Sequence, residues 1–276
     1  MYRGLREQRE KRILLILLAV IVIAVSLSVA GVSMLMRGQE SFAHGGGSDG
    51  ESDTESSNIE GSPNHKVLDY TDTWVVCLDP GHGYDDIGTE SGYLPSDTKE
   101  ADITLDVSLK VRELLQASGM EVLMTHDTNT VPAGATLDAD GKFLMDPMER
   151  AAYANGHDID LYVSIHCDSF EANEEVGGMR TYYHLDGGYD AATESLAGCI
   201  AEKFHVAVGG KDPILKSMSA DDAYYVIKHV NVPSVLIELG FVTNRTDAEN
   251  LLSDTWRQEA ARGIAEGILA YTQGDA

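Results

Sequence analysis

Trp74-Val75-Val76-Cys77-Leu78 is an apolar run with two β-branched residues, and it ends at Asp79-Pro80-Gly81. Such a run predicts a buried strand, and Asp-Pro-Gly predicts the loop that follows it. Residues 101–118 then carry apolar side chains at helical spacing, and residues 121–125 form a second strand-like run. A strand, a helix and a strand in this order favour an α/β fold built on a parallel sheet.

The same alternation continues along the rest of the chain. We expect further strands at 161–165, 178–183 and 234–237, and further helices at 147–155, 192–206 and 255–271. The predicted strands are apolar throughout, which is typical of a sheet that is covered on both faces. The sequence therefore predicts a single three-layer α/β domain over residues 73–273, with a mostly parallel twisted sheet and helices on both faces.

The charge balance excludes one class of partner. The chain has 276 residues, with 45 acidic residues against 20 basic ones, and a net charge of −25. Phosphate backbones would repel a protein this acidic, so we expect no nucleic-acid partner. Hydrophobic residues make up 43%, the ordinary share of a globular domain, so most of the chain is expected to fold.

The first part of the chain predicts the compartment. Residues 13–36 contain no charged side chain, and as a helix they would span about 36 Å, enough to cross a hydrocarbon core of about 30 Å. Basic residues precede this run, so residues 1–12 are expected to form a cytoplasmic tail and the rest of the chain to lie outside. A signal peptide cleaved after Ser28-Val29-Ala30 is the alternative to this transmembrane anchor, and it would give a secreted protein.

Residues 37–72 are expected to form a flexible acidic linker. This segment is rich in Gly, Ser and acidic residues and has little apolar surface to bury. The predicted layout is therefore a single-pass protein of the cell membrane, with its folded domain tethered outside the cytoplasm.

Polar side chains gather where predicted strands end. His82 follows the first strand between two glycines, while His166 and Glu238 each follow a later one. Open α/β sheets bind ligands at the carboxyl ends of their strands, so we expect these groups to meet at one edge. Two imidazoles and one carboxylate make an open zinc site, and a second carboxylate can act as a base. Spacing alone leaves both Glu90 and Glu100 open as the ligand carboxylate.

Each of these residues also has a simpler interpretation. A histidine is more often a surface or core residue than a ligand, and this chain has nine. For Glu238 the simpler interpretation is an ion pair, because a carboxylate beside a buried strand is costly unless it is paired or bound to a metal. No basic residue follows Glu238 until Arg245, which favours the metal site.

Four stretches, in order, resemble the motifs of zinc-dependent N-acetylmuramoyl-L-alanine amidases, the cell-wall hydrolases of the amidase type 3 group. The resemblance covers about residues 73 to 272. The stretches are 76–83 (VCLDPGHG), 99–105 (KEADITL), 149–155 (ERAAYAN) with 160–166 (DLYVSIH), and 233–244 (PSVLIELGFVTN).

The resemblance implies a site and a reaction. It implies one zinc ion per chain held by His82, Glu100 and His166, with Glu238 as the catalytic acid/base. It implies cleavage of the amide bond between N-acetylmuramic acid and the L-alanine of the stem peptide by zinc-activated water, with peptidoglycan as substrate. We expect a monomeric catalytic domain, and the layout is similar to that of membrane-anchored amidases of sporulation and the spore cortex.

The sequence departs from the family pattern at two places beside the expected ligands. Tyr84 stands where the family usually has a glycine, and Cys167-Asp168 stands where it usually has Ala-Asn. Neighbouring residues on a strand point to opposite faces, so Cys167 is expected to point away from His166 and Asp168 to point back toward the site. Another cell-wall zinc hydrolase, a peptidase or a deacetylase, is the alternative function. A non-catalytic wall-binding module on the same fold is a further one.

Overall fold

The structure is a computed structural model that describes residues 73–185, 188–219 and 221–274. The predicted cytoplasmic tail at 1–12, the predicted anchor at 13–36 and the predicted linker at 37–72 lie outside the described residues. In the part of the chain that is described, no helix has both the length and the apolar character needed to cross a bilayer.

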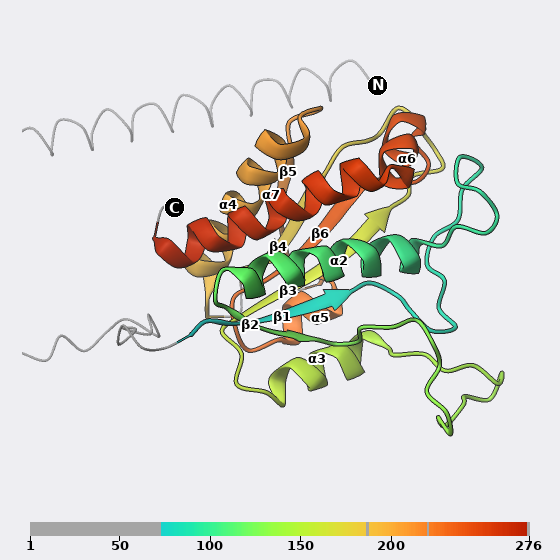
Figure 1. The fold of residues 1–276 in the computed structure, drawn as a ribbon, viewed down its shortest axis with the longest axis horizontal. Coiled ribbons are helices and arrows are strands. Elements are labelled where there is room, and N and C mark those ends of the chain that lie inside the picture. Colours follow the sequence, from blue (N-terminus) through green and yellow to red (C-terminus); the bar gives the residue numbers. More distant parts are fainter. Residues whose placement is uncertain (1–72, 186–187, 220, 275–276) are drawn as a thin grey trace, which may run out of the picture. The chain divides into compact units, whose positions relative to one another are not determined.

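Six strands form one sheet in the order β2-β1-β3-β6-β4-β5 (Figure 1). Every pairing between neighbours is parallel except that of β4 with β6, which is antiparallel. The prediction of a mostly parallel sheet is therefore confirmed, with a change of direction at β4. The strands are β1 (Val75–Pro80), β2 (Glu121–Met124), β3 (Leu161–Asp168), β4 (Arg180–His184), β5 (Ile214–Met218) and β6 (Ser234–Phe241).

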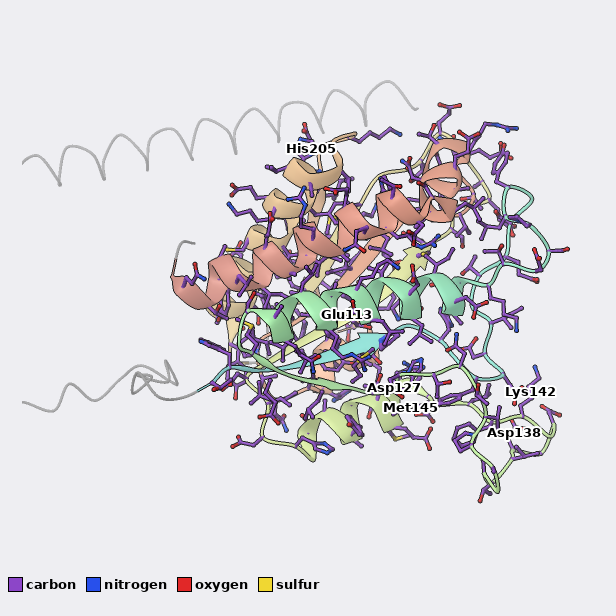
Figure 2. The ribbon with its side chains drawn as sticks, in the orientation of Figure 1. Glu113, Asp127, Asp138, Lys142, Met145 and His205 are labelled. Carbon is purple, nitrogen blue, oxygen red and sulfur yellow. The ribbon has the colours of Figure 1, made fainter. Side chains whose placement is uncertain are left out.

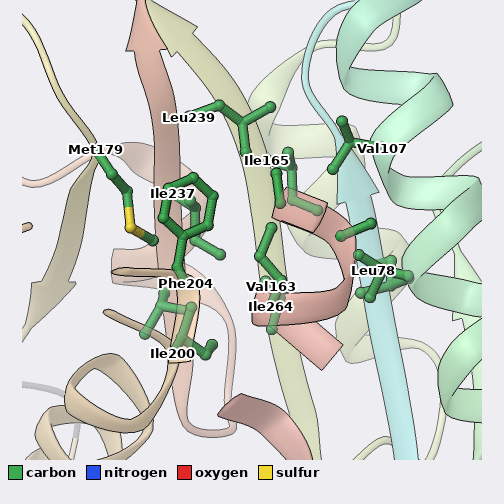
Figure 3. Close-up of a cluster of buried hydrophobic side chains, with 14 of the residues drawn as sticks. Leu78, Val107, Val163, Ile165, Met179, Ile200, Phe204, Ile237, Leu239 and Ile264 are labelled. Atoms are coloured by element: carbon green, nitrogen blue, oxygen red, sulfur yellow. The ribbon is translucent and has the colours of Figure 1, made fainter. Parts of the chain in front are cut away.

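Helices cover both faces of this sheet, as the sequence predicts. One face carries the larger core, in which Val163 and Ile237 of the sheet meet Phe204 and Ile264 of two helices (Figure 3). The other face carries a smaller core around Tyr162. The helices of the first face are α2 (Glu100–Ala117), α4 (Asp190–Val208), α6 (Arg245–Leu252) and α7 (Asp254–Gln273), and those of the second are α3 (Pro147–Asn155) and α5 (Tyr225–His229).

The alternation of strand side chains decides which polar groups share a face. Tyr162 packs in the smaller core, so His166, four residues later on β3, points to the same face. His166 is the register partner of Glu238 on β6, whose side chain therefore shares that face. Between His166 and Asp168 the register with β6 shifts, because β6 holds one residue more than β3 in this interval. The pairing resumes at Asp168 and Phe241.

Three elements and two strand ends differ from the prediction. The strand β5 and the helices α5 and α6 were not predicted, because β5 is almost fully exposed at the edge of the sheet and the two helices are only 5 and 8 residues long. His166 and Glu238 were expected just after their strands, and this was wrong. Both lie inside strands, since β3 continues to Asp168 and β6 continues to Phe241.

Candidate active site

The loop after β1 holds His82 in an unusual backbone conformation. His82 and Tyr84 have φ angles of 64° and 58°, a region that non-glycine residues rarely adopt. The guanidinium of Arg150, from α3, fixes this turn by donating hydrogen bonds to the carbonyl oxygens of Pro80, at 2.6 Å, and of His82. The surrounding structure thus imposes the conformation that exposes the imidazole.

The ring of His82 is oriented by a carboxylate that sequence analysis did not identify. Its Nδ1 lies 2.9 Å from Oδ2 of Asp86, which leaves Nε2 facing Glu100 at 3.2 Å from Oε1. A carboxylate on the far nitrogen of a histidine is the usual partner of a metal-binding imidazole. Asp86 lies four residues after His82, in a loop rather than in a helix or strand. No helical or strand periodicity in the sequence therefore identifies it.

Glu100 is fully buried at the first residue of α2. Its two carboxylate oxygens accept hydrogen bonds from the backbone N–H groups of Cys167, at 2.8 Å, and Thr89, at 2.7 Å. Burial opposes its ionisation, but hydrogen bonds and charge from His166 and His82 outweigh this and lower the pKa of Glu100. The carboxylate is therefore ionised and held rigidly.

His82, Glu100 and His166 form a group whose donor atoms all lie within 4.8 Å of one another. Oε1 of Glu100 is 3.2 Å from Nε2 of His82 and 3.5 Å from Nδ1 of His166. Tetrahedral zinc with bonds of about 2.0–2.1 Å requires ligand atoms about 3.3 Å apart, so this donor set fits the ion. Glu90, the other carboxylate that spacing left open, is exposed and does not belong to the group.

Two glycines make room for these side chains. A Cβ at Gly81 would lie 2.4 Å from the ring of His166. A Cβ at Gly88, which has a φ of 76°, would lie 2.6 Å from Oε2 of Glu100. The approach of the three candidate ligands therefore depends on the absence of side chains at both positions.

Glu238 lies on the same face as His166 but makes no hydrogen bond through Oε2, which is buried. Burial, together with the negative charges of Asp168 and Glu100, raises the pKa of Glu238 well above the usual carboxyl range. The side chain lines a cleft of about 360 Å³ that His82 and His166 also line. A buried carboxyl group that borders a cleft and has a raised pKa has the properties of a general acid/base.

The cleft has apolar walls on two sides. One wall is made by Leu144 and Met145, from the loop that leads to α3, and the other by Tyr224 and Tyr225. Met145 lies where this loop returns to α3, and Asp138 and Lys142 lie farther out (Figure 2). A groove with apolar walls and a polar floor is a typical site for an organic substrate.

A buried ion pair beneath the site was also missed by sequence analysis. Asp79 is fully buried and accepts hydrogen bonds from Arg150, at 2.8 Å, and from Thr125 and Ser164, each at 2.7 Å. Desolvation disfavours its charge, but Arg150 and the hydroxyl donors reverse that effect and lower the pKa of Asp79. The partners come from α3, from β3 and from the residue after β2, so only the folded chain brings them together.

Arg180, on β4, is a further residue that sequence analysis missed. It is the antiparallel register partner of Glu238, so a cation does lie beside this carboxylate although none follows it closely in the sequence. Asp168 points back toward the site as expected, with Oδ2 3.6 Å from Nη1 of Arg180. Cys167 packs in the core of the opposite face, where burial raises the pKa of its thiol, so it does not compete for the metal.

His126 makes the stability of the domain depend on pH. Burial, together with the nearby charge of Arg150, lowers the pKa of His126 from 6.5 to about 4. The unfolded chain therefore binds a proton at higher pH than the folded one. We expect the free energy of unfolding to fall by on the order of 2–3 kcal/mol as pH drops from about 6.5 to about 4.

Urea unfolding of metal-free protein across this pH range tests the effect. In the variant His126→Phe, the free energy of unfolding should depend much less on pH over this range than in the wild type, because phenylalanine cannot titrate. An identical pH dependence in both proteins would show that His126 is not the group responsible.

Three comparisons with known proteins identify the family of the chain. The sequence model of the N-acetylmuramoyl-L-alanine amidase family matches residues 76–270. The chain is 32% identical over 198 residues to the amidase LytC of Bacillus subtilis, covering 71% of this chain and 35% of LytC. It is 31% identical over 199 residues to the germination-specific N-acetylmuramoyl-L-alanine amidase of the same organism, covering 71% of this chain and 79% of that relative.

Solved structures show the same fold. The CwlD amidase of Clostridioides difficile, determined in complex with the GerS lipoprotein, superimposes with a TM-score of 0.64 at 29% identity, covering 74% of this chain and all of that one. An N-acetylmuramoyl-L-alanine amidase from Clostridium difficile 630 gives a TM-score of 0.62 at 26% identity, covering 74% of this chain and 99% of that one. The predicted α/β fold is thereby confirmed. The chain belongs to the N-acetylmuramoyl-L-alanine amidase family.

Proposed function

We propose that the protein is a zinc-dependent N-acetylmuramoyl-L-alanine amidase that cleaves peptidoglycan between N-acetylmuramic acid and the L-alanine of the stem peptide. One observation carries the proposal: His82, Glu100 and His166 converge, and both histidines line a cleft that Glu238 also lines, with no hydrogen-bond partner for its buried Oε2. Family membership supports the choice of an amidase over a cell-wall peptidase or deacetylase. The presence of all four groups argues against a non-catalytic module.

The division of labour follows from the chemistry of the groups. When bound to His82, Glu100 and His166, zinc would polarise the amide carbonyl and make a water molecule acidic. Glu238 would accept the proton of the attacking water, and its high pKa suits it to keep that proton. It would then donate the proton to the L-alanine nitrogen as the amide bond breaks. The apolar walls of the cleft would limit access of bulk water.

We propose that the organisation predicted from the sequence places this chemistry outside the cytoplasm. Residues 1–12 would be a cytoplasmic tail, 13–36 a membrane anchor or a cleaved signal peptide, and 37–72 a tether for the monomeric catalytic domain at 73–273. A tether of this kind raises the effective concentration of the enzyme at the wall. A role in sporulation or germination is consistent with the germination-specific relative.

Metal removal combined with product analysis tests the proposed function. The full chain is purified in detergent, its metal content is measured, and purified peptidoglycan is digested before and after treatment with a chelator. We expect about one zinc per chain, new L-alanine amino termini, and loss of both metal and activity on chelation that added zinc restores. New amino termini at other residues would indicate a peptidase, released acetate a deacetylase, and either result would overturn the amidase assignment.

A further inference from the structure

We propose that Arg180, together with Lys216, forms a subsite that binds a carboxylate of the stem peptide on the leaving-group side of the scissile amide. The inference rests on the proposed function and deepens it, since it assigns a direction to the substrate and a determinant of specificity. Arg180 is placed here as a specificity-determining residue that contacts substrate.

The strand register gives the substrate its direction. His166 on β3, Glu238 on β6 and Arg180 on β4 are successive register partners, so the three side chains form one row across the sheet. His166, with His82 and Glu100, would hold the metal that polarises the carbonyl, and Glu238 would return the proton to the leaving nitrogen. The departing peptide therefore extends past Glu238, toward β4 and β5.

The guanidinium of Arg180 retains unused hydrogen-bonding capacity. Its Nε is buried without a partner, and Nη1 lies 3.5 Å from the hydroxyl of Tyr182 and 3.6 Å from Oδ2 of Asp168. These separations are longer than those of good charge-assisted hydrogen bonds, which are about 2.7–2.9 Å. Arg150, in contrast, donates to Asp79 at 2.8 Å and is saturated by its own neighbours. Of these two arginines near the site, Arg180 is therefore the one that can still bind an anionic ligand.

The bulge in β6 prepares this guanidinium for binding. Because the register shifts after His166, Phe241 comes to the same face as Glu238, and Cζ of Arg180 lies 4.4 Å from the centre of its ring. Stacking on an aromatic ring orients the plane of a guanidinium and leaves its edge available to a carboxylate. The donors are thus oriented before a ligand arrives.

A second cation extends the subsite along the predicted path of the peptide. Lys216 on β5 is the register partner of Tyr182, and its Nζ lies 5.3 Å from the centre of the Tyr182 ring. Asp168 and Glu238 are the carboxylates beside Arg180, and Lys216 adds a second cation to this part of the sheet. In a chain with a net charge of −25, two neighbouring cations beside Glu238 favour an acidic ligand.

The spacing matches the chemistry of stem peptides. The proposal concerns stem peptides whose second and third residues carry a carboxyl group that is either free or amidated. A second residue lies about 7 Å from the scissile bond in an extended chain, and neighbouring strands are about 4.8 Å apart. A carboxylate at the second residue can therefore reach Arg180, and one at the third residue lies farther along, toward Lys216.

Pairs of substrates that differ only in one carboxyl group distinguish carboxylate binding by Arg180 from an electrostatic effect of Arg180 on Glu238. The full-length enzyme is assayed with disaccharide peptides whose carboxyl group is free or amidated, first at the second residue and then at the third. For wild type we expect kcat/KM to be about tenfold higher with the free carboxylate at the second residue, mostly through KM. Arg180→Gln should remove this preference, and Arg180→Lys should restore part of it. Lys216→Gln should change only the preference at the third residue.

The controls keep the outcome decisive. Loss of the positive charge near Glu238 affects both members of a substrate pair equally, so the ratio of their kcat/KM values reports carboxylate recognition alone. Arg262→Gln, at a half-buried arginine on α7 paired with Glu259 and Glu266, should leave the ratio unchanged. If Arg180→Gln kept the wild-type ratio of kcat/KM values, the subsite would be overturned and the amidase assignment would stand. If zinc-loaded wild type were inactive on every substrate, the proposed function itself would be overturned.

Discussion

Glu238→Gln is expected to lower kcat by about 10²–10⁴-fold while the protein keeps its metal. Glutamine has the same shape as glutamate but can neither accept the proton of water nor return it to the leaving nitrogen. The candidate ligands His82, Glu100 and His166 remain intact, so metal content should stay near one ion per chain. Metal analysis of the purified variant and a peptidoglycan digestion assay give the two readouts.

Two results would contradict this role for Glu238. Activity within about tenfold of wild type would exclude it as the acid/base, and loss of the metal would identify it as a ligand instead. Glu113→Gln is the matched control, because Glu113 is an exposed residue on α2 (Figure 2) and the same substitution there should change neither readout.

Arg150→Met is expected to destabilise the domain by about 3–5 kcal/mol, the largest effect on stability that we expect from a single substitution. Its side chain is 5% exposed and that of Asp79 is fully buried, so removal of the guanidinium leaves a buried carboxylate without its counter-charge. The carbonyl oxygens of Pro80 and His82 also lose their donor. We therefore expect weaker zinc binding as well as a lower midpoint of urea unfolding.

A second substitution separates the charge effect from the loss of packing. Asp79→Asn in the Arg150→Met background removes the unpaired charge and should recover part of the lost stability, but not the affinity for zinc. Arg257→Met serves as the control, because Arg257 pairs with Asp106 at 2.5 Å on more exposed side chains and should cost about 1 kcal/mol. If both variants lost the same free energy of unfolding, burial of the Asp79–Arg150 pair would not increase its contribution to stability.

The sequence predicts most of the fold because its central strands are apolar on both faces and are separated by clear helical periods. This pattern disappears at the edge of the sheet, where β5 is exposed, and the antiparallel direction of β4 has no local signature. The ends of β3 and β6 were misplaced because polar residues normally mark the end of a buried strand. Here the strands continue through His166 and Glu238, whose side chains face a cleft.

The candidate ligands could be selected from the sequence because each belongs to a recognisable motif. The residues that support them could not, because their partners are distant along the chain. Asp79 meets Arg150 71 positions later, and Glu238 lies beside Arg180, which precedes it by 58 positions. Only the folded arrangement of strands and helices brings such pairs together.

Because β6 has one extra residue opposite the interval from His166 to Asp168, the number of residues in this part of β6 decides which face Phe241 lies on. Deleting that residue would turn Phe241 toward the large core and leave Arg180 without the ring that it stacks on. The residues His166, Glu238 and Arg180 would themselves be unchanged. Family members that differ in length at this point should therefore differ in which peptides they accept, even where their metal-binding residues are the same.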